Sequence, residues 1–246
     1  MKRIPPSAQI ERGRLPTHVA MIMDGNGRWA TARGKERLEG HRAGVDAVLR
    51  VVDWCREAGI GYLTLYAFST ENWRRSAHEV SGLMRLMGVM LRTKVGLLRK
   101  RNVRLRVIGR LEDLSPALRR NIVAVERGTA TCDGLQLTLA ISYGGRAEIA
   151  EAARRFACDV RDGRAEAEAL SDEAFRQYLY APDVPDPDLV IRTSGEFRLS
   201  NFLLWQSAYA ELWVTPVLWP DFSKEDFQAA LSAYAARDRR MGGRSA

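Results

Sequence analysis

The chain has 246 residues, of which 46% are apolar and 28% are charged, a composition typical of a soluble globular protein. Its net charge of +8 at pH 7 and its pI of about 9.7 indicate an anionic partner, which is phosphate, nucleic acid or a membrane surface. The first 16 residues lack the apolar core of a signal peptide, and no later segment approaches the about 18 apolar residues of a membrane span. These features exclude a secreted or membrane-spanning chain, so we expect a cytoplasmic protein.

In chain order, residues 1–16 contain three prolines and predict a flexible N-terminal arm, followed by one domain over 17–243. Short apolar runs predict strands over 18–24, 62–68, 103–108, 135–142, 189–191 and 211–214. Amphipathic stretches predict helices over 41–58 and about 78–100, and further helices that begin near 115, 145, 170 and 223. Strands that alternate with helices favour an α/β domain whose mostly parallel central sheet is flanked by helices.

Polar segments follow four of the predicted strands. They are Asp24–Arg28, Ser69–Arg75, Tyr143–Arg146 and Arg192–Glu196. Because ligands of parallel sheets collect at the carboxyl ends of the strands, we expect these segments to form one site.

The segment after the first strand changes character at Asp24, where the apolar run meets a carboxylate followed by Gly-Asn-Gly-Arg-Trp. Glycines let the backbone turn tightly and approach a ligand, Arg28 supplies a forked cation, and Trp29 supplies an apolar wall. This chemistry suits a diphosphate site that also holds a metal ion. Taken alone, the motif favours an ordinary strand-to-helix turn, so partners elsewhere in the chain must decide.

Several basic and hydroxyl side chains lie near the same loops. They are Arg28, Arg37, His41, Arg75, Arg192 and Arg198, with Ser69, Asn72 and Ser200 as neutral partners. The planar guanidinium matches phosphate oxygens, so two or three arginines per diphosphate are reasonable. Mg²⁺ typically takes one or two carboxylates plus substrate phosphates, and Asp24 and Glu211 are the candidates. Each of these residues, taken singly, also fits a solvated surface position.

Whole motifs extend this interpretation. The segments HVAMIMDGNGRWA, GHRAGVDAV, LTLYAFSTENWRR, NVRLRVIG, ISYGGRAEI, DLVIRTSGEFRLSNFLLWQSAYAEL and LWPDFSKEDF follow one another along the chain. In order and spacing they resemble the cis-prenyltransferase family, and the resemblance covers residues from about His18 to Gly243.

The resemblance implies an enzyme that condenses isopentenyl diphosphate with an allylic diphosphate, farnesyl or geranyl, to give a Z-polyprenyl diphosphate. Undecaprenyl diphosphate, the lipid carrier of cell-wall synthesis, is the expected product. A short-chain Z-prenyl diphosphate synthase and a non-catalytic accessory subunit of a heteromeric prenyltransferase are the alternatives.

The resemblance also assigns roles to individual residues. Asp24 and Asn72 are expected to be catalytic, with Mg²⁺ held by Asp24 and Glu211. The allylic diphosphate is expected at Gly25, Asn26, Gly27, Arg28, Trp29, Arg37 and His41. A mobile loop contributes Ser69, Glu71, Trp73 and Arg75, with Glu79 at its hinge, and isopentenyl diphosphate binds Arg192, Arg198 and Ser200. No carboxylate or histidine is obviously dedicated to removing the substrate proton, so Asn72 is expected to orient the reacting group while a diphosphate oxygen or water accepts the proton.

The growing chain needs an apolar tunnel, and the long helix over 78–100 carries a broad apolar face. The expected lining is Ala67, Leu83, Leu86, Val107, Leu135, Leu137 and Ile141, with Met84, Met87 and Met90 beside them. Two residues depart from the family pattern: Phe197 replaces a polar residue, and Trp213 is bulkier than is common.

Partners follow from the same resemblance and from the charge. The tail residues Arg240 and Gly242 match an Arg-x-Gly pattern that reaches a neighbouring subunit, so we expect a homodimer. A basic cluster, Arg85, Arg92, Lys94, Arg99, Lys100, Arg101, Arg104, Arg106 and Arg110, makes a nucleic-acid binder the main non-enzyme alternative. Because no nucleic-acid-binding motif accompanies it, we expect no nucleic-acid partner and interpret it as a solvated surface, with peripheral contact at the inner face of a membrane as an option.

Overall fold

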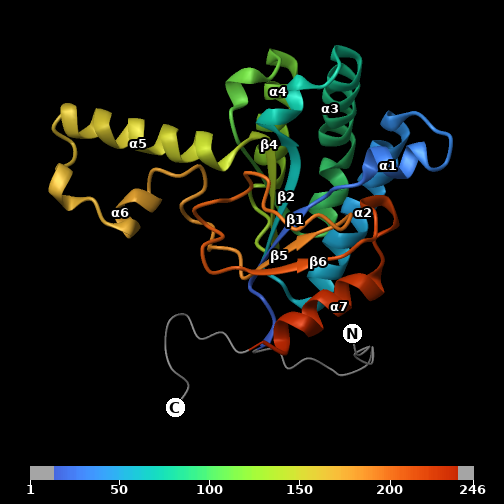
Figure 1. Cartoon of the computed structure of the whole chain (residues 1–246). Helices are drawn as coiled ribbons and strands as arrows, with labels where there is room; N and C mark the ends of the chain where they lie inside the picture. Colours follow the sequence, from blue (N-terminus) through green and yellow to red (C-terminus); the bar gives the residue numbers. More distant parts are fainter. Residues whose placement is uncertain (1–13, 238–246) are drawn as a thin grey trace.

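Six short apolar segments form one sheet in the computed structural model, which describes residues 14–237 (Figure 1). The strands are β1 (His18–Ile22), β2 (Tyr62–Ser69), β3 (Val103–Ile108), β4 (Leu135–Tyr143), β5 (Leu189–Arg192) and β6 (Glu211–Val214). They lie in the order β3-β4-β2-β1-β5-β6, and every neighbouring pair is parallel. The predicted α/β domain with a mostly parallel sheet is confirmed.

The helices are α1 (Asn26–Thr31), α2 (Arg37–Ala58), α3 (Ala77–Lys100), α4 (Pro116–Thr129), α5 (Gly145–Arg161), α6 (Asp172–Arg176) and α7 (Lys224–Ala235). Two predicted helix starts coincide with side-chain caps. Ser115 accepts a hydrogen bond from the N–H of Leu118, and Ser223 forms a reciprocal capping box with Asp226. Figure 1 shows α5 and α6 reaching away from the sheet, while α3 and α4 lie side by side.

Alternating side chains of the strands divide the core between the two faces of the sheet. Val19 and Met21 pack with apolar residues of α2, α3, α4 and α7 in the larger cluster. Ala20 and Ile22 pack on the opposite face with Tyr143 and residues of the segment that follows β5. Because α3 covers one face without filling the space next to β2 and β4, room remains for the cavity described below.

The register brings the predicted polar segments to one edge. Ile22 pairs with Tyr66 on one side and with Arg192 on the other, and Ser69 pairs with Tyr143. The loops that follow β1, β2, β4 and β5 therefore leave the sheet at the same edge, as the sequence predicted.

Two local features differ from the expectations. Residues 26–31 form α1, and the polar segment over 70–74 is a 3-10 helix, η2 (Thr70–Arg74), rather than an open loop. Neither segment has an apolar period of its own. Packing of α1 on α2 and the capping box of Ser69 and Asn72 stabilise them instead.

Among residues 14–237, no helix is both long enough and apolar enough to cross a membrane. The predicted arm over residues 1–16 and the tail motif at Arg240 and Gly242 lie largely or wholly outside the described residues.

Candidate active site

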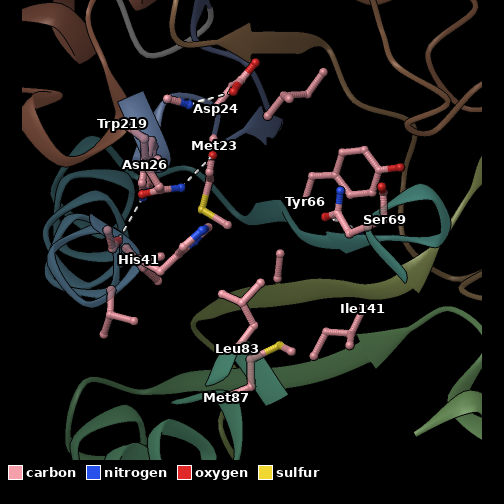
Figure 2. A pocket seen from close by; sticks show the side chains of 18 of the residues that line it. Met23, Asp24, Asn26, His41, Tyr66, Ser69, Leu83, Met87, Ile141 and Trp219 are labelled. Atoms are coloured by element: carbon pink, nitrogen blue, oxygen red, sulfur yellow. Dashed lines mark hydrogen bonds between the residues drawn. The ribbon is translucent and has the colours of Figure 1, made fainter. Parts of the chain in front are cut away.

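A cavity of about 700 Å³ opens at the carboxyl edge of the sheet, between the strands and the helices α2 and α3. Its mouth is polar and its interior is apolar. Figure 2 shows Asp24, Asn26 and His41 on one side, with Leu83, Met87 and Ile141 at the other end of the view.

The turn after β1 forms one wall of the mouth. Gly25 has φ 104°, a left-handed conformation that only glycine adopts without strain. Helix α2 approaches this turn so closely that a Cβ at position 44, where the helix has glycine, would lie 2.3 Å from Oδ1 of Asn26. That Oδ1 is buried and has no hydrogen-bond partner among the described residues, while the Asn26 amide donates to the carbonyl of Met23 at 3.0 Å.

Asp24 and Arg192 join two loops at the centre of the mouth. Arg192 is 3% exposed and donates to Asp24 Oδ2 at 2.9 Å and to Ser200 Oγ at 2.7 Å. Gly25 N–H donates to Asp24 Oδ1 at 2.7 Å. Burial favours the neutral carboxyl, but the hydrogen bonds and the charge of Arg192 outweigh it and lower the pKa of Asp24. Asp24 is therefore an anion at neutral pH.

Arg28 lies one helical turn beyond Asp24, on α1. Its Nη2 is 3.5 Å from Asp24 Oδ1, and its guanidinium donates to the carbonyl and the hydroxyl of Ser194. The side chain is 52% exposed at the cavity mouth. It therefore retains access to a ligand oxygen.

Glu79, in the first turn of α3, gathers three basic residues across the mouth. Arg75 Nη1 lies 2.9 Å from Oε1, Arg37 Nε lies 3.4 Å from Oε2, and His41 Nε2 lies 3.8 Å from Oε1. Burial and the charges of Arg75 and Arg37 lower the pKa of His41 to about 4, against the opposing charge of Glu79. His41 is therefore neutral at pH 7, and the two arginines supply the positive charge.

The η2 segment is held at both of its ends. Asn72 Oδ1 accepts from Ser69 N–H at 3.1 Å, and the Asn201 amide donates to Glu71 at 2.8 Å. Burial opposes ionisation of Glu71, but the hydrogen bonds, that of Asn201 foremost, outweigh it and lower its pKa. The η2 segment is thereby tied to the loop after β5.

Trp73 is held at the other side of η2. Its indole N–H donates to Ser142 Oγ at 2.8 Å, and that hydroxyl donates to Asp113 Oδ2 at 2.8 Å. The ring packs edge-on against Phe68. Trp73 therefore anchors η2 to β4 and does not line the cavity.

The apolar end of the cavity includes four residues of the predicted tunnel: Ala67, Leu83, Leu86 and Ile141. Met87 and Met90 lie beside them on α3. Val107, Leu135 and Leu137 are buried in the larger core cluster and do not line this cavity. Their assignment to a tunnel stays a prediction.

Four predicted binding or metal residues lie outside the cavity lining: Trp29, Trp73, Arg198 and Glu211. Trp29 donates from its indole to Asp221 at 2.7 Å and packs under Arg33, so its ring does not line the cavity. The Arg198 side chain is 59% exposed and pairs with Glu196 at 2.6 Å. The Arg198 carbonyl accepts from Arg192 at 2.5 Å, so the backbone of this residue contributes to the site.

Glu211 is separated from Asp24 within one chain. It begins β6 and pairs with Leu189, which pairs with Val19, so it lies at the amino end of the sheet. Five residues separate that level from Asp24, roughly 16 Å at 3.3 Å per residue of extended chain. Glu211 instead forms an ion pair with Arg237. Because position along a strand decides which edge a side chain reaches, Asp24 and Glu211 do not form a metal-binding pair in one subunit. No cluster of three potential metal ligands occurs among residues 14–237.

Sequence reasoning missed several residues that complete the site. Tyr66 lines the cavity, and its hydroxyl donates to the carbonyls of Tyr143 at 3.1 Å and Ser200 at 3.4 Å. Asn201 lines it too and has φ 64°, as an asparagine tolerates better than most residues. The sequence contained a signal for both, since Tyr66 lies in the C-terminal half of a predicted strand and Asn201 follows Ser200.

A cationic, glycine-lined mouth that opens directly onto an apolar cavity defines a protein that binds an anionic head group attached to an apolar chain. Arginine guanidiniums and backbone N–H groups hold the anion, while Leu and Met side chains exclude water from the chain. The comparisons with known proteins point to the same class.

The sequence model of a family described as "Putative undecaprenyl diphosphate synthase" matches residues 22–242. An isoprenyl transferase of Heliobacterium mobile is 50% identical over 237 residues, 96% of this chain and 91% of its own length. A ditrans,polycis-undecaprenyl-diphosphate synthase of Pectobacterium atrosepticum, specific for (2E,6E)-farnesyl diphosphate, is 51% identical over 228 residues, 93% of this chain and 90% of its own. Lavandulyl diphosphate synthase of Lavandula x intermedia, solved with dimethylallyl diphosphate, superposes with a TM-score of 0.91 at 37% identity, covering 94% of this chain and 99% of that one.

The chain belongs to the undecaprenyl diphosphate synthase family and is a prenyltransferase. The resemblance to the cis-prenyltransferases noted in the sequence is thereby confirmed.

Proposed function

We propose that this prenyltransferase condenses isopentenyl diphosphate with farnesyl or geranyl diphosphate and forms a Z double bond at each addition, with undecaprenyl diphosphate as the product. One observation carries the proposal: the arginine-lined mouth opens directly onto an apolar cavity along α3. That juxtaposition suits a substrate with a diphosphate at one end and a hydrocarbon chain at the other. The names of two relatives include (2E,6E)-farnesyl diphosphate and dimethylallyl diphosphate, and both of these compounds are allylic diphosphates.

The mouth supplies two groups of cations for two diphosphates. Arg28, Arg37 and the N–H groups of the Gly25–Gly27 turn lie beside α1 and α2, where they would hold the allylic diphosphate. Arg192 and Ser200 lie beside β5, where they would hold isopentenyl diphosphate, with Arg198 at its exposed side. Asp24 lies between the two groups.

Ionisation of the allylic diphosphate transfers negative charge to the leaving diphosphate, which the arginines stabilise. The apolar wall of the cavity protects the electron-poor carbon from water. The Asp24 side chain is 32% exposed, so part of its carboxylate remains accessible to a metal ion. Mg²⁺ bound there with substrate oxygens would withdraw electron density from the leaving group.

The proton lost from isopentenyl diphosphate passes to a diphosphate oxygen or to water, while Asn72 orients the reacting group. Its Oδ1 accepts from Ser69 N–H, and Asn72 lines the cavity, so its amide N–H₂ is the group that would contact the substrate. An Asn72→Ala variant with normal turnover at saturating concentrations of both substrates would contradict this role.

We further propose a homodimer at the outer edge of the sheet. The edge strand β6 is only half-buried, and the segment between β5 and β6 exposes Phe197 (79%) and Tyr209 (74%). Large apolar side chains beside an open strand edge are typical of a protein interface. We place the protein in the cytoplasm, with peripheral contact at the inner face of the membrane.

Incubation of the purified chain with labelled isopentenyl diphosphate, Mg²⁺ and either geranyl or farnesyl diphosphate, followed by product sizing, tests the function. We expect chain elongation from an allylic starter and loss of product when EDTA removes the metal.

Asp24→Ala and Asp24→Asn should lower kcat/KM by about 100-fold or more, because each removes the anion between the two groups of arginines. Full activity of both variants would refute the assignment, and an inactive but folded wild-type chain would favour the accessory-subunit alternative. A product of only two or three isoprene units would favour the short-chain synthase.

A further inference from the structure

We propose that the outer surface of α3 and α4 docks onto a membrane that contains anionic lipids. The surface, named here the α3–α4 face, consists of Arg85, Val89, Arg92 and Arg99 of α3 with Arg120, Val123 and Arg127 of α4. Figure 1 shows these two helices side by side, at the opposite end of the molecule from α7.

Helix periodicity places the members of the face together. On α3, positions 85, 89, 92 and 99 follow the spacing i, i+4, i+7 and i+14, which is one stripe of an α-helix. On α4, positions 120, 123 and 127 follow i, i+3 and i+7. All seven side chains are exposed, while Leu83, Leu91 and Leu98 on the opposite side of α3 are buried.

The two helices form one continuous surface because they contact each other along their length. Asn121 of α4 donates to the Gly88 carbonyl of α3 at 3.5 Å, and a Cβ at Gly128 would lie 2.9 Å from Val95. Residue 88 of α3 thus lies beside residue 121 of α4, and residue 95 of α3 lies beside residue 128 of α4. This register places Arg120 and Arg127 beside the stripe of Arg85, Arg92 and Arg99.

The face carries charge of one sign. Between Glu79 and Glu112 the sequence has nine basic residues and no acidic one. Arg85, Arg92, Arg99, Arg120 and Arg127 make no ion pair with the described residues, in contrast to Arg101, Arg106 and Arg110, which pair with carboxylates. Glu126, the one acidic residue of α4, turns inward and accepts from Val107 N–H at 2.8 Å. Unpaired guanidiniums on one surface attract a polyanion.

Two observations favour a lipid surface over a nucleic acid. Val89 (41% exposed) and Val123 (46% exposed) are apolar side chains among the arginines, as interfacial membrane-binding surfaces require. The face contains no aromatic side chain on which a base would stack. The choice also rests on the proposed function, because a polyprenyl product held along the inner side of α3 must pass into a lipid phase.

Co-sedimentation with vesicles tests the proposal without substrate. Wild-type protein should bind vesicles of phosphatidylcholine with phosphatidylglycerol, should not bind pure phosphatidylcholine, and should dissociate as NaCl rises. The variant Arg85→Gln/Arg92→Gln/Arg99→Gln should lower the partition coefficient on the order of a hundredfold, since each arginine near an anionic surface contributes a factor of five or so. The control Arg154→Gln/Arg161→Gln/Arg164→Gln removes three exposed arginines of the α5 region, which pair with carboxylates, and should bind as the wild type does.

Three results would overturn the proposal: no preference of the wild type for anionic vesicles, equal losses in both triple variants, or loss of single-stranded DNA binding in the α3 variant with vesicle binding intact. Condensation activity in detergent, measured on the same samples, separates this proposal from the proposed function. The α3 variant should keep wild-type activity there, because none of the three arginines lines the cavity. Vesicle binding by a chain that lacks condensation activity would refute the proposed function and leave the docking surface in place.

Discussion

Arg192 contributes three interactions that join separate loops of the site. Its guanidinium donates to Asp24, to the hydroxyl of Ser200 and to the carbonyl of Arg198, and its side chain is almost entirely buried. A planar fork with several fixed donors satisfies all three acceptors at once, which a single ammonium group does not. The identity of this residue therefore matters beyond its charge.

The variant Arg192→Lys should lower kcat/KM by about 10- to 100-fold, since charged hydrogen bonds of this kind contribute about 1.5–3 kcal/mol. Steady-state kinetics with isopentenyl diphosphate as the varied substrate measure the effect. Arg176→Lys is a matched control, because Arg176 also bonds three acceptors, Asp186 and the carbonyls of Pro182 and Val184, but lies outside the cavity lining. A comparable loss of kcat/KM in both variants would show that the site depends only on stability.

His18 is a second residue whose environment decides its behaviour. It is 2% exposed, and its ring nitrogens contact the carbonyl of Pro185 at 2.6 Å and the hydroxyl of Thr64 at 2.8 Å. Burial lowers the pKa of His18 from 6.5 to about 4 against the opposing hydrogen bond of Pro185. Between pH 6.5 and about 4, His18 is protonated in the unfolded chain but neutral in the folded chain. Its contribution to the free energy of unfolding is therefore fully present above pH 6.5 and decreases as the pH falls toward 4.

Urea unfolding should therefore show a free energy of unfolding that is lower at pH 5.0 than at pH 7.5, with a contribution of about 2 kcal/mol from His18. The variant His18→Gln keeps a side chain that can donate and accept but does not titrate. We expect it to lose that part of the pH dependence, whatever its stability at pH 7.5. An unchanged difference between the two pH values would contradict the assignment.

At the scale of elements, η2 and α3 frame the mouth of the cavity. The η2 segment is short and depends on contacts made elsewhere, with Glu71 bonded to Asn201 and Trp73 bonded to Ser142. Ser142 is fully buried, has φ 49° and donates onward to Asp113. The position of Asn72 within η2 therefore depends on the hydrogen bond that β4 provides.

Replacement of Ser142 by Ala should lower kcat/KM roughly tenfold, because it leaves the indole N–H of Trp73 without its partner. A double-mutant cycle provides the measurement: in a Trp73→Phe background the same Ser142→Ala change should have little further effect. Thermal melting of each variant identifies losses due to unfolding. Equal effects of Ser142→Ala in both backgrounds would exclude the coupling.

The sequence predicted the strands and the longer helices well because their apolar periods are strong. The stretch 103–108 coincides with β3, and α3 begins at Ala77, one residue before its expected start. It did not predict α1 or the 3-10 character of η2, since both are stabilised by tertiary packing and caps rather than by a pattern of their own. Family resemblance identified Arg192 and Asn72, whereas the orientation of Trp29 and the distance of Glu211 from Asp24 depend on three-dimensional geometry.

For the whole molecule, the sheet and α3 enclose a cavity whose far end consists of side chains of β2, β4 and α3. Ala67 leaves space in that wall because its side chain is a single methyl group. A larger side chain there would fill part of the cavity volume.

The variant Ala67→Phe should therefore give shorter products while the first condensation proceeds at a rate within about threefold of the wild type, because the mouth is unaltered. Radiolabelled products resolved by thin-layer chromatography provide the measurement. Ala169→Phe, which adds the same ring on an exposed segment, is the control and should give the wild-type distribution. Unchanged product lengths in Ala67→Phe would place the growing chain outside this cavity.

The carboxylate of Glu79 provides the mouth with an anion of its own. Its single negative charge is shared by Arg37 of α2 and by Arg75, which precedes α3, so an arriving diphosphate replaces one counterion with another. Binding is then an exchange reaction, in which part of the attraction to the substrate offsets the loss of the internal ion pairs. The ion pairs that join the first turn of α3 to Arg37 and Arg75 would then weaken as the substrate binds.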